Sequence, residues 1–213
     1  MDDPNGVEAY TNSASQIYLE RIDRTFVDQA LSLGISEGNA LDMGTGPGLI
    51  PVMLATRAPK LRLTGVDLST PMLEKARKSA EEAGLANRIE FRLGDVKSLP
   101  FSQGSFDLVL CNSLLHHLSV PLALLNEISR VSKPGGAILL RDLRRPSRIE
   151  FPFHALWFGR HYSGLMSQLY RASLKASYTR VELENLLSCS KLAGAHVFQT
   201  SRTHIGIQRT TSL

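Results

Sequence analysis

Residues 39–53 of the chain read NALDMGTGPGLIPVM. A short apolar run, interrupted by Asp42, leads into a turn with glycine at positions 44, 46 and 48, and a second apolar stretch follows. In parallel α/β sheets, a buried strand, a glycine turn and a helix in this order present backbone N–H groups and a helix N-terminus to a ligand. Proline is favoured in a first helical turn, so Pro47 predicts that the helix has begun there.

The spacing of these glycines distinguishes two kinds of ligand site. A dinucleotide fingerprint is G-x-G-x-x-G, whereas here the third glycine comes one residue early and Leu49 stands in its place. An acid followed by G-x-G-x-G instead resembles motif I of the class I S-adenosylmethionine-dependent methyltransferases. The resemblance implies a set of residues at the methionine end of that cofactor: Asp42, Gly44, Thr45, Gly46 and Gly48.

Composition and charge are those of an ordinary globular protein. The 213 residues suit one domain, and 43% are hydrophobic and 21% charged. Cys111 and Cys189 lie in apolar segments and form no disulfide framework. The N-terminal MDDPNG is acidic, so we expect no secretory signal there. The longest uncharged stretch, residues 108–126, is too polar for a membrane span. We expect a cytoplasmic protein.

A second expected strand, residues 61–66, ends at Asp67, 19 residues beyond Gly48. A carboxylate there can accept both ribose hydroxyls of an adenosine ligand, whether NAD or S-adenosylmethionine. Residues 69–71, Ser-Thr-Pro, predict a helix start with hydroxyl caps, and Asp67 could alternatively serve only as a cap of that helix. The resemblance adds two cofactor-binding residues beside it: Leu68 and Met72.

Residues 88–93 form a third expected strand, which leads into Asp95 and Val96. In class I methyltransferases an Asp at this place accepts a hydrogen bond from the adenine amine, and the amide of the next residue reaches a ring nitrogen. The resemblance therefore implies an adenine site at Asp95 and Val96. An ordinary Gly-Asp turn is the alternative.

The fourth expected strand, residues 105–111, resembles the F-D-x-V segment of the family. Asn112 and Ser113 follow, and the resemblance places them at the floor of the cofactor site. Leu115-His116 resembles the Leu-His of plant-type phenolic O-methyltransferases, in which a histidine takes the hydroxyl proton. Imidazole titrates near neutrality, so His116 is the candidate catalytic base and His117 a second one. The alternatives are loop-anchoring histidines and an acceptor that needs no base.

A segment of different composition, rich in aromatic and basic residues, follows the fifth expected strand, residues 137–140. Seven of the chain's 14 aromatic residues fall between positions 151 and 178. Between positions 141 and 180 the charge balance is +6, so the rest of the chain carries −2. We expect residues 144–178 to form a helical lid over the methyl end of the cofactor.

The basic residues of this region suggest a kind of acceptor. Arginines beside aromatic residues suit a small acceptor with a carboxylate or phosphate and an apolar body. A solvated basic lid is one alternative, and contact with RNA is another. The arginines in question lie at or just after the end of the fifth strand: Arg141, Arg144, Arg145 and Arg148.

The predicted fold is one Rossmann-like α/β domain over residues 1–213. It has a seven-stranded, mostly parallel sheet with helices on both faces, and its last two strands, residues 195–201 and 203–209, form an antiparallel pair. Residues 1–35 would form an N-terminal helical cap, from which Tyr10 or Tyr18 would cover the ligand or merely pack at the surface.

The predicted function is in-line transfer of the methyl group of S-adenosylmethionine to a small molecule, leaving S-adenosylhomocysteine and using no metal. An RNA methyltransferase and a non-catalytic S-adenosylmethionine-binding regulatory module are alternatives, and an NAD-linked oxidoreductase is a third. Asn112 is not followed by the Pro-Pro-aromatic sequence typical of amino methylation of nucleic-acid bases. The acceptor atom and the oligomeric state stay open.

Overall fold

The computed structural model describes residues 13–211, with side chains from residue 19 onward. Seven strands form one sheet in the order β3-β2-β1-β4-β5-β7-β6. All neighbouring strands pair in parallel except at β7, which is antiparallel to β5 and to β6. The predicted fold class is confirmed. The strands are β1 Glu37–Met43, β2 Lys60–Asp67, β3 Ile89–Leu93, β4 Phe106–Asn112, β5 Ser132–Leu143, β6 His196–Gln199 and β7 His204–Arg209.

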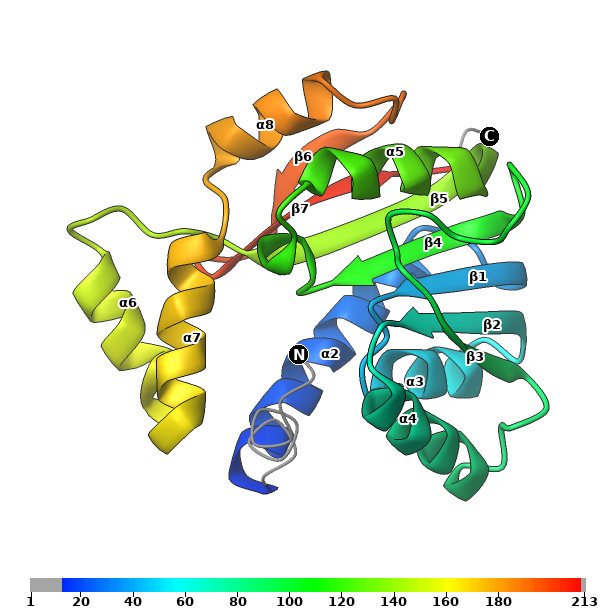
Figure 1. Ribbon diagram of the computed structural model, residues 1–213, viewed down its shortest axis with the longest axis horizontal. Coiled ribbons are helices and arrows are strands. Elements are labelled where there is room, and N and C mark those ends of the chain that lie inside the picture. The colour runs from blue at the N-terminus through cyan, green and yellow to red at the C-terminus, as the bar shows by residue number, and fades with distance from the viewer. Residues whose placement is uncertain (1–12, 212–213) are drawn as a thin grey trace.

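Helices cover both faces of the sheet (Figure 1). Helices α2, α3 and α4 lie on one face and α5 and α8 on the other, and each layer encloses its own cluster of buried apolar side chains. The helices are α2 Ser13–Ser32, α3 Leu49–Arg57, α4 Thr70–Glu82, α5 Pro121–Val131, α6 Phe151–Trp157, α7 Gly164–Ala176 and α8 Arg180–Ser188, with 3-10 turns η1 Leu115–His117 and η2 Gly159–His161.

Two predicted helix starts differ in detail from the structure. Pro47 lies in the turn before α3, and the N-cap is Gly48 with φ 78°. A Cβ on Gly48 would approach the Cβ of Ala76 to 2.7 Å, so glycine permits both the left-handed backbone and the close approach of α4. At the start of α4, Ser69 is the N-cap, but its side chain forms no capping hydrogen bond.

Strand β5 is longer than predicted at both ends. It begins at Ser132, with a register shift against β4 between Phe106 and Leu108. It continues to Leu143 because β7 pairs with it as far as Leu143 and His204. The extension brings Arg141 and Asp142 into the sheet at its carboxyl edge.

The lid segment is defined as residues 144–178, and its two ends lie side by side. Arg144 and Tyr178 form an isolated bridge, and the Arg145 N–H donates to the Tyr178 carbonyl at 3.0 Å. Within the segment, α7 packs against η1, and η2 packs against α2. Figure 1 shows α6 and α7 projecting beyond the carboxyl ends of the strands. Among the described residues, no helix has both the length and the apolar character needed to cross a bilayer.

Candidate active site

The carboxyl ends of β1, β2 and β4 meet where the strand order reverses, because β1 lies between β2 and β4. Ligands bind open α/β sheets at this point. Asp42 is the penultimate residue of β1, Asp67 is the last residue of β2, and Asn112 is the last residue of β4. The structure thus brings three predicted cofactor residues to one edge of the sheet.

The carboxylate of Asp67 is held between the glycine turn and α4. Gly46 N–H donates to its Oδ2 at 2.8 Å, and Ser69 N–H donates to its Oδ1 at 2.9 Å. Each carboxylate oxygen keeps a further lone pair, so ligand hydroxyls can still donate to it. Gly46 has φ 53°, and no atom lies within 4 Å of the position its Cβ would take. The turn therefore has open space beside a fixed acceptor.

Three oxygens around this turn are buried and have no hydrogen bond of normal geometry among the described residues: Asp42 Oδ2, Thr45 Oγ1 and Ser69 Oγ. Buried polar atoms are rarely left in this condition, so a ligand that donates hydrogen bonds would fit here. Burial raises the pKa of Asp42 to about 7; the nearby Thr45 hydroxyl opposes the shift, and the charges of Asp23 and Asp67 add to it. A cationic group would favour the ionised carboxylate. The ammonium and ribose hydroxyls of S-adenosylmethionine have the required chemistry.

Asp23, on α2, is a site residue that sequence reasoning missed. Its Oδ1 accepts a hydrogen bond from Asn112 Nδ2 at 3.0 Å. Burial raises the pKa of Asp23 to about 7, although the positive charge of Arg141 opposes the shift. The available signal was an acid between Ile22 and Phe26 on an otherwise apolar helix face. Tyr10 and the side chain of Tyr18, the predicted covers, lie outside the described residues.

The residues predicted at the adenine end differ in how exposed they are. Asp95 accepts from the Lys97 backbone N–H at 2.9 Å and pairs with its Nζ at 2.8 Å, and these bonds lower the pKa of Asp95. Val96 and Met72 are buried, whereas Leu68 is 58% exposed. An exposed leucine directly after Asp67 leaves an apolar surface that a flat aromatic ring could cover.

His116 is paired with a buried carboxylate. Its Nδ1 lies 2.6 Å from Asp142 Oδ1, and its backbone N–H donates to Asp142 Oδ2 at 3.0 Å. The two side chains are only 4% and 2% exposed. An ionised carboxylate can only accept, so Nδ1 carries the proton and Nε2 is left as an acceptor. His117 is exposed, with its ring 4.0 Å from that of His116.

Asp142 was not assigned to this pair from the sequence, although one signal was available. Parallel strands end at the same edge, so an acid at the end of β5 lies near the turn that follows β4. Ser113 makes that turn with φ 55°, and its N–H donates to the Arg141 carbonyl at 2.8 Å. The two predicted residues Asn112 and Ser113 thus form the link between strand β4 and η1.

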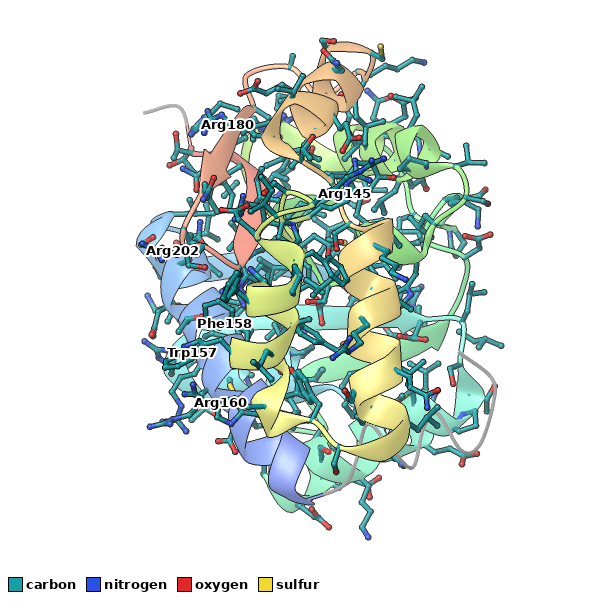
Figure 2. The ribbon with its side chains drawn as sticks, turned by 90° about the vertical axis from the view of Figure 1, so that its left-hand side faces the viewer. Arg145, Trp157, Phe158, Arg160, Arg180 and Arg202 are labelled. Atoms are coloured by element: carbon teal, nitrogen blue, oxygen red, sulfur yellow. The ribbon has the colours of Figure 1, made fainter. Side chains whose placement is uncertain are left out.

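The arginines predicted to bind an anionic acceptor are mostly engaged elsewhere. Arg141 is buried, donates to Thr25 Oγ1 at 2.9 Å and to the Ile22 carbonyl at 2.8 Å, and thereby holds α2 against the sheet. Its assignment to the acceptor is wrong for this reason. Arg144 pairs with Glu150 and Arg145 with Glu182, and Figure 2 labels Arg145 at the base of the lid. Arg148 is exposed and forms no ion pair within residues 13–211.

The part of the chain that the structure describes contains no group of three His, Cys, Asp or Glu side chains that could hold a metal ion. Burial raises the pKa of the Cys111 thiol well above its ordinary value, so this thiol stays neutral. The polar groups at the sheet edge include carboxylates, hydroxyls, the Asn112 amide, backbone N–H groups and one imidazole.

The fold is the Rossmann-like fold of known methyltransferases. Residues 41–140 match the family described as "Methyltransferase domain". An uncharacterized methyltransferase of Schizosaccharomyces pombe is 31% identical over 153 residues, which are 70% of this chain and 54% of that protein. A ubiquinone/menaquinone biosynthesis C-methyltransferase UbiE of Desulfotalea psychrophila is 34% identical over 57% of this chain and 48% of that protein.

The whole chain has the architecture of solved methyltransferases. The crystal structure of a SAM-dependent methyltransferase from Aquifex aeolicus superposes with a TM-score of 0.69, covering 97% of both chains at 20% sequence identity. This chain spans about half the length of the relatives it matches by sequence. Residues 41–140 are therefore similar in sequence to methyltransferase domains, and the whole chain shares the fold of class I S-adenosylmethionine-dependent methyltransferases.

Proposed function

We propose that this protein transfers a methyl group from S-adenosylmethionine to a small-molecule acceptor. The main support is the set of three buried oxygens beside the glycine turn that have no hydrogen bond of normal geometry in the described residues, at Asp42, Thr45 and Ser69. Asp42 and Asp23 would hold the ammonium of the cofactor, and Asp67 would hold its ribose. When bound, S-adenosylmethionine supplies a methyl group already activated by the sulfonium, so the main task of the protein is to position the acceptor and exclude water.

His116 is proposed as the general base. Asp142 holds the imidazole in the tautomer that leaves Nε2 free to accept a proton from an acceptor hydroxyl or an acidic carbon. The relative from Desulfotalea psychrophila is named a C-methyltransferase of ubiquinone/menaquinone biosynthesis, which favours carbon or oxygen as the receiving atom. The proposed acceptor is apolar in body and possesses an anionic group, for which Arg148 is the unpaired cation nearest the end of β5 within the described residues.

The remaining proposals concern the organisation of the protein. The N-terminal cap (residues 1–35) and the lid segment would close the site from two sides, and the reaction would take place in the cytoplasm. Proton transfer at His116 needs this closure because bulk water would compete for Nε2.

Calorimetric titration with S-adenosylmethionine, S-adenosylhomocysteine and NAD tests the proposal. We expect the two sulfur ligands to bind and NAD not to bind. Asp67→Ala should weaken S-adenosylmethionine by more than about tenfold, because two hydrogen bonds to a charged group are lost. Asp28→Ala removes a carboxylate on the exposed face of α2 and serves as the control.

Two results would contradict the proposal. NAD binding in preference to S-adenosylmethionine would indicate an oxidoreductase. Cofactor binding without turnover of any acceptor, RNA included, would indicate a regulatory module instead of an enzyme.

A further inference from the structure

The outer face of α6 and the residues before it carry large apolar side chains that are exposed in the described part of the chain. Ile149, Phe153, Leu156 and Trp157 are between 64% and 84% exposed. Phe153, Leu156 and Trp157 lie on one side of α6, Ile149 lies in the turn before it, and His154 and Ala155 on the other side are buried. We call these four side chains the apolar face of the lid. Contiguous exposed apolar residues of this kind mark an interaction site.

Exposed basic residues precede and follow α6 in the chain and continue on α7. Arg148, Arg160, Arg171 and Lys175 are exposed, and none forms an ion pair with a side chain in the described residues. The guanidinium of Arg160 lies over the ring of Trp157, with its Cζ 4.6 Å from the ring centroid. Figure 2 looks onto the lid and places Trp157 and Arg160 together at one side of it, beside α2. Arg148, next to Ile149 in the chain, and Arg160, over Trp157, therefore lie beside the apolar face, and neither forms an ion pair within the described part of the chain.

We propose that the lid binds an anionic lipid membrane surface, with α6 lying in the plane of the interface. Aliphatic and aromatic side chains beside arginines are the composition that enters the boundary between headgroups and acyl chains. Each nearby arginine or lysine adds electrostatic attraction to anionic headgroups. The position of α6 at the outer side of the molecule allows it to reach a flat surface (Figure 1).

The charges and side-chain types of this face favour a membrane over two other partners, a second copy of the chain and a single-stranded nucleic acid. A second copy of the chain would bring the same four cations against each other, which disfavours self-association. Single-stranded nucleic acid is bound by stacking on aromatic rings, but Ile149 and Leu156 have no ring to offer. The inference goes beyond the proposed enzymatic function and does not depend on it.

The fluorescence of Trp157 provides a direct test, because it is the only tryptophan in the chain. The probe is vesicles of phosphatidylcholine and phosphatidylglycerol in equal amounts. We expect a blue shift of the emission and co-sedimentation of the protein with these vesicles, and much weaker binding to phosphatidylcholine alone. Binding should weaken as salt is raised, since the Debye length falls from about 8 Å at physiological ionic strength to about 3 Å at 1 M.

Paired variants test the two parts of the surface. Phe153→Ser with Leu156→Ser should weaken vesicle binding at least about tenfold, because two apolar side chains no longer leave water. Arg160→Glu should also weaken it about tenfold. Val181→Ser, at an equally exposed site on α8, and Arg62→Glu are the matched controls and should bind vesicles like the unaltered protein.

Titration of each variant with S-adenosylmethionine separates this inference from the proposed function, because the lid variants should keep the affinity of the unaltered protein. The inference fails if Trp157 emission does not change with anionic vesicles at low salt, or if the lid variants bind vesicles as well as the controls do. It also fails if sedimentation shows a dimer that Phe153→Ser with Leu156→Ser dissociates, or if an oligonucleotide or an acidic protein is bound and vesicles are not.

Discussion

At the scale of single residues, Asp142 determines what His116 can do. Its carboxylate accepts from the Nδ1 and the backbone N–H of His116, and also from the Leu143 N–H at 2.6 Å. Three donors and near-complete burial keep this carboxylate in one position. The imidazole is thereby fixed in both tautomer and orientation. Asp142 is a positioning residue, and His116 is the group that would meet the acceptor.

Replacing either member of this pair should reduce turnover and leave cofactor binding intact. We expect His116→Ala to lower kcat by about 10²- to 10⁴-fold, the usual contribution of a general base. Asp142→Asn should lower kcat and also alter the dependence of kcat on pH, which a purely structural role would not do. Calorimetry gives the cofactor affinity in each case. His117→Ala tests the second candidate base and should keep full turnover, and full turnover by His116→Ala would show that the base is assigned wrongly.

The raised pKa values of Asp42 and Asp23, both about 7, predict opposite effects of pH on binding and on stability. Cofactor affinity should fall as pH decreases through 7, because protonated carboxyls no longer attract the ammonium. Without cofactor, stability should fall as pH rises from about 4 to about 7, because in that range the unfolded chain has released protons that the folded chain still holds.

Thermal unfolding with and without S-adenosylmethionine across this range measures both effects. The increase in Tm on adding the cofactor should grow with pH. Asp42→Asn should flatten this dependence and weaken binding, while Asp28→Asn, in an exposed ion pair, should change neither. An increase in Tm that is equal at both ends of the range would contradict the assignment of these carboxylates.

At the scale of elements, the connection between β3 and β4 shows how an irregular segment is held in place. Residues 94–105 are all described and contain no helix, yet they carry Asp95 and Val96. On α5, Glu127 Oε1 accepts from the Leu99 N–H at 2.6 Å, and Arg130 donates to the carbonyls of Phe101 and Leu99 at 2.6 and 2.9 Å. The side chains of Glu127 and Arg130 on α5 thus satisfy backbone groups of Leu99 and Phe101 that no regular secondary structure satisfies.

Arg130→Ala should loosen this connection. We expect a loss of about 2 kcal/mol in the free energy of unfolding, because the buried Glu127 and two carbonyls lose their donor. Cofactor affinity should fall as well, through the adenine end. Urea denaturation and calorimetry measure the two changes. Arg180→Ala, which breaks an exposed pair with Glu184, should change stability by less than about 0.5 kcal/mol.

At the scale of the whole molecule, Arg141 joins the sheet to the N-terminal helix. It lies on β5, bonds Asn112 on β4 at 3.2 Å, and stacks on Phe26 of α2 with its Cζ 4.9 Å from the ring centroid. Burial lowers its pKa to about 10, which still leaves it charged near neutral pH. Arg141 thus helps to hold Asp23 in the site, together with the buried apolar residues of α2 and the hydrogen bond from Asn112.

Arg141→Leu should therefore affect stability and cofactor binding together. Removing a buried cation that satisfies Asp23 and several acceptors should cost about 3–5 kcal/mol in the free energy of unfolding. Cofactor affinity should also fall, because α2 no longer holds Asp23 at the sheet edge. Denaturation and titration of this variant beside Arg148→Leu, an exposed arginine, test the expectation. An effect on stability without any effect on affinity would separate α2 from the site.

Much of the fold was predictable because its signals are local. The glycine turn, the acids at strand ends and the capping box of α8, in which Thr179 Oγ1 accepts from the Glu182 N–H, lie in short stretches of chain. The prediction that the helix has begun at Pro47 was wrong because proline suits a turn as well as a first helical turn. The left-handed backbone at position 48 requires glycine, and the helix begins after it. The residues Asp23 and Asp142 were missed because their roles depend on which distant elements pack together.

The bridge between Arg144 and Tyr178 has a consequence for how such a protein can diversify. The chain between those two residues leaves the sheet and returns to the same point. Strands β5 and β7 pair with each other without any residue of this segment. A shorter, longer or differently folded insert could therefore occupy the same junction without disturbing the cofactor cradle. Related proteins could then differ in the lid segment, and so in their acceptor and in the surface they attach to. The residues that bind the sulfonium cofactor would stay the same.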